Sequence, residues 1–163
     1  MTEQAKRRGL HHIGYWVDDL DVAMADAQRL LGVGPFKVLE HIDLGDFRFL
    51  GSSAAVLDHS AAFTAWGPVL LELNQVHVVD PPELREALGI KHGAVSHVSW
   101  TTDDLDAEGA HMAAAGCALL TTSVGGAVAN WFSGGPLFGH AVEIHQPPER
   151  VLNFWQSIID ESS

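Results

Sequence analysis

An internal duplication constrains the fold of this chain more than any other feature. The ten residues HIGYWVDDLD that begin at His12 return 85 positions later as HVSWTTDDLD, which begins at His97. Each copy also ends in a matched piece, LELNQ from Leu71 and VEIHQ from Val142. The chain is therefore expected to contain two similar modules, each of which supplies one His near its start and one Glu near its end.

The composition is that of a globular chain. Of its 163 residues, 47% are hydrophobic and 18% are charged, and no apolar run reaches the roughly 18 residues that a membrane span requires. Nine Lys and Arg against 21 Asp and Glu give a net charge of −12, which repels phosphate backbones and anionic membranes. We therefore expect neither nucleic acid nor a membrane as a partner.

The cysteine content and the N-terminus indicate where the protein works. Cys117 is the only cysteine, so the chain cannot form an internal disulfide. The N-terminal residues MTEQAKRR lack the apolar stretch of a secretion signal. Both features are typical of the reducing cytoplasm, which is the expected location.

The first module is predicted to cover residues 9–79. Residues 10–17 have the pattern of a strand, and the pair Asp18-Asp19 then precedes apolar positions spaced as one face of a helix, which ends at Gly32. Further strands are expected at residues 36–42, 47–50 and 69–76. Residues 51–67, rich in Ser and Ala, fit either a lid over a site or a long connection.

The second module repeats this order over residues 94–148. A strand is expected at 94–102, a helix at 103–115, and strands at 118–122, 129–133 and 140–146. Residues 80–93 are predicted to be a linker with a short helix, and residues 149–163 an amphipathic C-terminal helix. Each module is thus a strand, a helix and three strands, which makes the fold class α+β.

The repeated His and Glu residues predict a metal site. Side chains two apart on a strand share a face, so Glu72 faces the same side as Asn74, and Glu143 the same side as His145. A carboxylate between apolar neighbours on a strand needs a polar cavity or a cationic partner. His and Glu recur at matched places in both modules, and these residue types suit a divalent cation. The predicted ligands are His12, Glu72, His97 and Glu143.

Other residues near this site are assigned by the same reasoning. His145 is the best spare acid or base, or a partner that orients a ligand, while His11 faces away from His12 and is the weaker candidate. The repeated Asp pairs are explained by helix capping and receive no chemical role. The predicted substrate pocket, mainly aromatic, comprises Trp16, Phe47, Trp66, Asn74 and Trp131.

At this point the chain resembles the vicinal oxygen chelate superfamily, which includes glyoxalase I, methylmalonyl-CoA epimerase, extradiol dioxygenases and bleomycin resistance proteins. The resemblance covers residues 9–148 and rests on LHHIG from Leu10, both DDLD helix starts, LEL around Glu72, SHV around His97, and VEIHQP from Val142. It implies two tandem βαβββ modules that form a cupped mixed sheet, with the metal held in the cup by the four predicted ligands.

The chain departs from named members of this family at two points. In the epimerases an additional carboxylate of the first module is expected to serve as a second base, and the candidates here are Glu40, Asp43 and Asp46. The basic residues with which glyoxalase I binds glutathione are not evident, since Lys37 and Arg48 are the cations of this region. The motifs therefore indicate the superfamily without selecting one activity.

Three functions follow from these observations. The favoured one is a metal-dependent isomerase, epimerase or lyase that acts on a small carbonyl or thioester compound through an enolate, with Glu143 or Glu72 as the base. The alternatives are a metal-free protein that sequesters a drug-like ligand and an Fe(II) dioxygenase, although the latter generally leaves three metal positions free whereas four protein ligands leave two.

The expected cofactor and partners follow from the same reading. Oxygen and imidazole ligands without thiolate suit Mn, Co, Ni, Fe, Zn or Mg. The aromatic residues favour a small-molecule substrate with an apolar body. A homodimer is also expected, because dimers are common in the family that the chain resembles and because Phe154 and Trp155 of the C-terminal helix offer an apolar surface.

Overall fold

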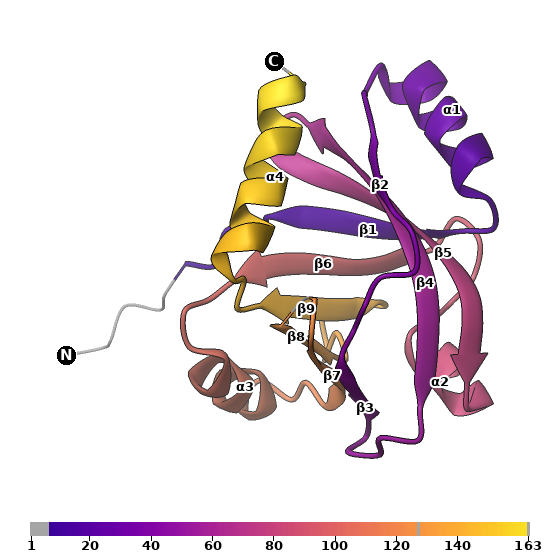
Figure 1. The fold of residues 1–163 in the computed structure, drawn as a ribbon. Coiled ribbons are helices and arrows are strands. Elements are labelled where there is room, and N and C mark those ends of the chain that lie inside the picture. The colour runs from indigo at the N-terminus through magenta and orange to yellow at the C-terminus, as the bar shows by residue number, and fades with distance from the viewer. Residues whose placement is uncertain (1–6, 127, 163) are drawn as a thin grey trace.

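The computed structural model describes residues 7–126 and 128–162, and its element order repeats one unit twice (Figure 1). The first unit contains β1 (His12–Val17), α1 (Leu20–Leu31), β2 (Lys37–Leu39), β4 (Val56–Trp66) and β5 (Val69–Asp80). The second contains β6 (Val95–Thr101), α3 (Leu105–Ala114), β7 (Leu119–Val124), β8 (Val128–Phe132) and β9 (Ala141–His145). An additional strand β3 (Asp46–Phe49), a short helix α2 (Pro82–Ala87) and the C-terminal helix α4 (Glu149–Glu161) complete the fold.

The nine strands of the described ranges form one mixed sheet, in the order β2-β4-β5-β1-β6-β9-β8-β7-β3. The two units meet at the centre of the sheet, where β1 of the first unit pairs antiparallel with β6 of the second. On its other side each of these strands has a parallel neighbour from its own unit, β5 beside β1 and β9 beside β6. The predicted α+β fold with two tandem βαβββ modules, a cupped sheet and a C-terminal helix is confirmed.

The sheet must be curled because consecutive strands β2 and β3 lie at its opposite edges. Nine strands side by side in a flat sheet would separate these edges by about 38 Å. The chain from Leu39 to Asp46 can span at most about 25 Å. The crossover segment, residues 40–45, therefore closes over the open side of the cup, and Figure 1 shows it in front of the sheet.

Backbone contacts fix the crossover segment against the second unit. The Gly126 amide donates a hydrogen bond of 3.0 Å to the Asp43 carbonyl, and Gly45 bridges to Val124. A Cβ atom on Gly125 would collide with the backbone of Gly45. These contacts require glycine at the place where the two edges meet.

Helices α1 and α3 begin after Asp caps, as predicted, and cover the outer face of the sheet. The Asp19 side chain accepts a hydrogen bond from the Val22 amide at the start of α1, and Asp104 caps α3 in the same way. Leu71 and Leu73 of β5 pack in the cluster formed with α1, and Val142 and Ile144 of β9 in the cluster formed with α3. The alternate residues of these strands are therefore left to face the inside of the cup.

The prediction for residues 51–67 was incomplete, because most of this stretch is strand β4 and not a lid or a connection. Both faces of β4 are covered: Ala62 is buried under α1, and Ala61 is buried in the cluster formed with α4. A strand covered on both faces has no alternation of polar and apolar residues to reveal it.

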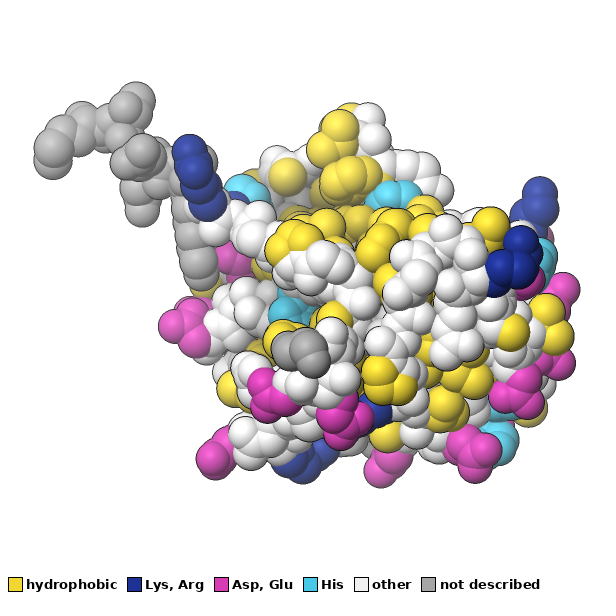
Figure 2. All heavy atoms as spheres, turned by 90° about the horizontal axis from the view of Figure 1, so that it is seen from above, with side chains coloured by type: hydrophobic (Ala, Val, Ile, Leu, Met, Phe, Trp, Pro, Cys, Tyr) yellow, Lys and Arg dark blue, Asp and Glu magenta, His cyan; other side chains and the backbone are white. Residues whose placement is uncertain are grey.

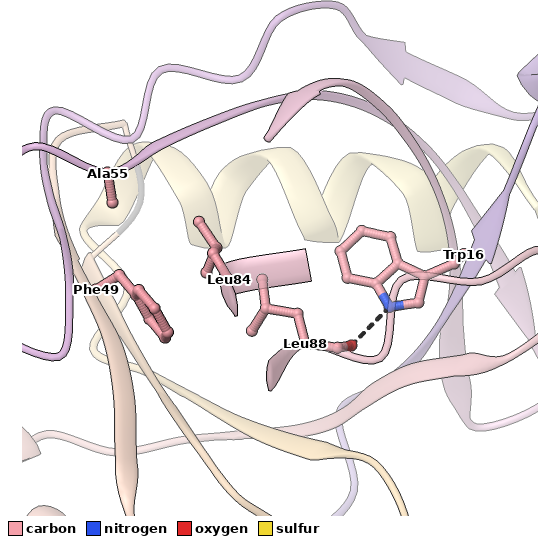
Figure 3. Close-up of a cluster of buried hydrophobic side chains, with 5 residues drawn as sticks. All are labelled: Trp16, Phe49, Ala55, Leu84 and Leu88. Carbon is pink, nitrogen blue, oxygen red and sulfur yellow. Dashed lines mark hydrogen bonds between the residues drawn. The ribbon is translucent and has the colours of Figure 1, made fainter. Parts of the chain in front are cut away.

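Trp16 lies in a hydrophobic core cluster at one end of the cup, together with Phe49, Ala55 and two leucines of the α2 region, Leu84 and Leu88 (Figure 3). Its indole Nε1 donates a hydrogen bond of 3.0 Å to the Leu88 carbonyl. Trp16 shares the inward face of β1 with His12, as predicted, but α2 and the chain after it cover this part of the face.

Helix α4 packs within the chain. Trp155 and Ile158 join the buried cluster of Ala61, Phe63 and Leu70, and the Phe154 ring lies 5.5 Å from that of Phe63. The aromatic surface on which a homodimer was expected is therefore used inside the protomer. No helix in the described ranges is long and apolar enough to cross a membrane.

Candidate metal centre

The His/Glu cluster (His12, Glu72, His97 and Glu143) is built by four adjacent strands at the centre of the sheet. The two His residues come from β1 and β6, and the two Glu residues from the flanking strands β5 and β9. Glu72 is in register with Gly14, and Glu143 with Ser99, which lies 85 positions after Gly14. The symmetry of the duplication therefore brings all four side chains to one point.

The distances within the His/Glu cluster match those between ligands of one divalent ion. Five of the six separations between its Nε2 and Oε2 atoms are 3.0–3.3 Å, and all four ligand atoms lie within 4.8 Å of one another. Neighbouring ligands at about 2.1 Å from an ion are roughly 3.0 Å apart in an octahedron and roughly 3.4 Å apart in a tetrahedron. The cluster could therefore hold a metal ion.

Charge explains why four polar side chains are stable in this buried position. Burial by itself would lower the pKa of His97, but Glu143 and Glu72 outweigh burial and raise that pKa to about 10. Burial alone would raise the pKa of each glutamate, but nearby histidines lower it, chiefly His97 for Glu72 and His145 for Glu143. The cluster thus holds two carboxylates that attract positive charge, as protons or as a metal ion.

The outer nitrogens of both histidines have partners. His97 Nδ1 lies 2.9 Å from Ser96 Oγ, and His12 Nδ1 lies 2.8 Å from His11 Nδ1. Burial, followed by the nearby His12 and His145, lowers the pKa of His11 to about 4, so a neutral His11 can accept a hydrogen bond from His12. His11 was predicted to face away from His12, but it contacts the His12 ring and holds that ring with the His12 Nε2 toward the cluster.

Glu143 has two further partners. Trp131 Nε1 donates a hydrogen bond of 2.8 Å to Glu143 Oε1, and His145 Nε2 lies 3.0 Å from Glu143 Oε2. No comparable partner outside the His/Glu cluster contacts Glu72 in the described part of the chain. The structure therefore places His145 where the sequence expected a spare acid, base or orienting group.

Gly14 creates the space that His97 occupies. The two residues are opposite each other in the β1–β6 pair, and a Cβ atom on Gly14 would lie 2.5 Å from His97 Cε1 and 2.8 Å from its Nδ1. His97 has no exposed surface, and its other side meets the Trp131 ring, with the ring centres 4.5 Å apart. The imidazole can keep its position only if residue 14 has no side chain.

The His/Glu cluster opens into a cavity of about 410 Å³ between the sheet, the crossover segment and α4. His12, Glu72 and Glu143 line it, together with His145 and the predicted pocket residues Phe47 and Trp131. Half of the remaining lining residues are apolar, namely Leu39, Ile42, Leu44, Leu57, Phe63, Val151, Phe154 and Trp155, and the polar ones include His41, Thr121 and Ser123.

Three other predicted pocket residues lie outside the cavity lining. Trp16 is in the core cluster described above, Trp66 packs in the α1 cluster on the outer face, and Asn74 is buried with its Nδ2 lacking a hydrogen-bond partner in the described ranges. Strand parity predicted that Asn74 and Trp16 lie on the inward face of the sheet. Other side chains pack against that part of the face, so both residues are buried and do not line the cavity.

Charged groups lie at the rim of the cavity. Of the three candidates for a second carboxylate, Glu40 and Asp43 line the cavity, whereas Asp46 forms an ion pair with Arg48. Arg150 is the only Lys or Arg among the described lining residues, and its guanidinium donates to the carbonyls of Gly125 and Gly126. Acidic side chains are mostly peripheral to the central apolar area in Figure 2.

Sequence reasoning missed most of the cavity wall, including His59, Arg150 and Trp155. His59 belongs to β4, which the periodicity did not reveal. Trp155 lies with its ring 4.1 Å from that of His11 and 5.2 Å from that of His145, contacts that depend on how α4 packs. None of the three had a sequence pattern that placed it at the cavity: His59 lies between Asp58 and Ser60 in a stretch without periodicity.

Solved structures share this fold. Methylmalonyl-CoA epimerase from Mycobacterium tuberculosis superposes with a TM-score of 0.56 at 16% identity, over 93% of this chain and 97% of that one. A Streptomyces coelicolor methylmalonyl-CoA epimerase in complex with 2-nitronate-propionyl-CoA gives 0.56 at 18%, over 86% and 96%. A hypothetical protein from Bacillus halodurans C-125 gives 0.59 at 16%, over 88% and 97%.

Sequence comparison gives the family. The curated proteins contain no match to this chain. The family described as "Glyoxalase/Bleomycin resistance protein/Dioxygenase superfamily" matches residues 11–132, which include β1 through β8 and three of the four residues of the His/Glu cluster. The chain belongs to the glyoxalase/bleomycin resistance protein/dioxygenase superfamily.

Proposed function

We propose that this protein is a metal-dependent isomerase, epimerase or lyase that removes an α-proton from a carbonyl substrate. The observation that carries the proposal is the His/Glu cluster, whose ligand atoms converge within 4.8 Å of one another at an apolar cavity. A bound divalent ion would supply Lewis acidity that stabilises the negative charge on the substrate oxygen. Mn, Co, Ni, Fe, Zn and Mg all suit these ligands.

Glu143 is the proposed base. Its Oε1 accepts a hydrogen bond from the Trp131 indole and its Oε2 lies 3.0 Å from His145 Nε2, which is the donor in that contact, so both oxygens of the carboxylate are held in place. His145 lines the cavity and can pass the proton on or hold it until it returns to the substrate. Glu72 has fewer partners and is proposed mainly as a ligand.

The residues of the cavity wall limit the class of substrate that we propose. Carriers such as coenzyme A bring several phosphate groups, which proteins bind with Lys and Arg. The described lining contains one such residue, Arg150, whose guanidinium donates to two backbone carbonyls. The wall and the net charge of −12 favour a compact carbonyl compound with an apolar body over an acyl-CoA.

The first test combines metal content with α-proton exchange. Protein purified without added metal should contain about one divalent ion per chain and should exchange the α-protons of aryl ketones or α-keto acids in D₂O. Glu143→Gln should slow exchange by about 10²- to 10⁴-fold. Glu161→Gln, an exposed carboxylate of α4 paired with Lys37, is the matched control and should leave both measurements unchanged.

Two outcomes would refute the proposal. A protein that neither contains nor takes up a divalent ion would favour a metal-free protein that sequesters an apolar ligand in the same cavity. Exchange that persists unchanged in Glu143→Gln would show that Glu143 is not the base. Oxygen consumption with Fe(II) and a catechol would instead support the dioxygenase alternative.

A further inference from the structure

His59 of β4 is a buried histidine whose hydrogen-bonding capacity is unused within the described ranges. The side chain lines the cavity, the residue is 8% exposed, and its Nδ1 is shielded from solvent without a partner. Neither ring nitrogen makes a hydrogen bond to another described residue. A polar group buried in this way costs free energy and requires an explanation, such as a bound water or a ligand; unlike Thr64 and Ser99, which share this feature, His59 lines the cavity.

The position of His59 places it across the cup from the proposed base. Strands β5, β1 and β6 separate β4 from β9 in the curled sheet, so β4 and β9 form opposing walls with the His/Glu cluster between them. The other residues that β4 contributes to the lining are Leu57 and Phe63, which are apolar. Among the described lining residues of β4, His59 is therefore the only polar one, while Glu40, His41 and Asp43 of the neighbouring segment also line the cavity.

The charge state of His59 defines which groups it can bind. Burial lowers its pKa, and this effect outweighs the opposing influence of Glu72, Glu143 and Asp58, while His97 lowers the pKa further. The ring is therefore neutral at pH 7, with one nitrogen that donates and one that accepts. A neutral imidazole in an apolar wall suits a hydroxyl or carbonyl group better than a phosphate or a carboxylate.

We propose that His59 is a substrate-binding residue that hydrogen-bonds an uncharged oxygen group of the substrate, at the end remote from the metal centre. The proposal rests on the proposed function for the placement of the reacting carbonyl. It defines the substrate class more narrowly, as a carbonyl compound with an apolar body and a second oxygen, hydroxyl or carbonyl, on the β4 side.

Hydroxamates test this proposal because their two adjacent oxygens chelate a divalent ion while the ring occupies the cavity. The affinities of benzohydroxamate, 3-hydroxybenzohydroxamate and 4-hydroxybenzohydroxamate are measured by calorimetry on metal-loaded protein. At least one ring hydroxyl should increase affinity by about three- to tenfold in the wild-type protein. His59→Phe should abolish this gain, His59→Gln should retain part of it, and neither variant should change metal content.

Thr64→Val is the matched control. Thr64 lies on the same strand, is fully buried and also has an unpartnered oxygen, but it has the parity of Ala62, which packs under α1 on the outer face. This variant should keep the gain from the ring hydroxyl. The proposal is overturned if no hydroxylated probe binds more tightly than benzohydroxamate, or if His59→Phe keeps the gain.

A second measurement separates this proposal from the proposed function. The ring nitrogens of His59 are followed by ¹⁵N NMR in metal-free protein during titration with 4-hydroxyacetophenone, and tryptophan fluorescence, to which the lining residues Trp131 and Trp155 contribute, reports that the cavity is filled. A change in the His59 resonances supports the proposal even if the protein takes up no metal, a result that would refute the enolate mechanism alone. Unchanged His59 resonances in a filled cavity overturn the proposal.

Discussion

Gly14→Ala tests the architecture of the metal centre with a single methyl group. The added Cβ would collide with Ser96 Oγ and would lie 2.5 Å from His97 Cε1, whereas ordinary carbon contacts are roughly 3.5–4.0 Å, so the serine side chain must turn away and the ring must move by about 1 Å. Ser96 Oγ holds the imidazole at Nδ1 and Trp131 lies against its ring, so no free space is available. Displacement of one ligand on this scale should weaken metal binding by about 10- to 100-fold.

The same substitution should reduce stability, because it adds volume to a packed interior. Overpacking of this kind typically costs about 1–3 kcal/mol in the free energy of unfolding. The assay is calorimetric titration of metal-free protein with Zn²⁺ and Mn²⁺, together with urea unfolding without metal. Only the two measurements together separate a displaced ligand from a general loss of structure.

Ser99→Ala is the matched control for Gly14→Ala. Ser99 occupies the equivalent place in the second module, already carries a Cβ atom, and has a buried hydroxyl without a partner in the described ranges. Its removal should leave metal affinity within about twofold of wild type. If Gly14→Ala bound metal as tightly as the wild-type protein, the steric account of the centre would be wrong.

Three further predictions concern protons and packing. Metal affinity should rise with pH from about 6 toward 10, because the pKa of His97 is raised to about 10 and that of His12 is also raised, so both must lose protons before they bind a metal ion. Binding should therefore release about one to two protons at pH 7, which calorimetry in buffers of different ionisation enthalpy measures. The free energy of unfolding of metal-free protein, measured by urea titration, should be largest between about pH 4.5 and 6.5. The lowered pKa values of Glu72 and Glu143 give stability that is present above the ordinary pKa of a glutamate and is lost on acidification. The raised pKa of His97 gives stability that is present below the ordinary pKa of a histidine and is lost toward pH 10. Trp16→Phe should lower the free energy of unfolding by about 1–3 kcal/mol, because the hydrogen bond to Leu88 and part of the side-chain volume are lost. Metal affinity should not change. A large change in metal binding would contradict the assignment of Trp16 to the core.

Features set by local sequence were predictable from the chain alone. The duplication fixed two units of the same order, the Asp caps and Gly32 located the helix ends, and strand parity put the inward-facing His and Glu residues on one face. Repetition also identified the His/Glu cluster, because two equivalent strands at the seam of two equivalent modules bring equivalent residues together. Each of these inferences depends on residues a few positions apart or on the repeat, whose offset is 85 positions for the two His residues and 71 for the two Glu residues.

Features that depend on what covers a surface were decided by the tertiary structure. Strand β4 has no periodicity because α1 and α4 bury both of its faces, so neither the strand nor the position of His59 could be read from the sequence. Trp16 and Phe47 are both aromatic, yet α2 covers the first while the second lines the cavity. Residues 40–45 could not be recognised as the closure of the cup, because their role exists only once the sheet has curled and brought its two edges together.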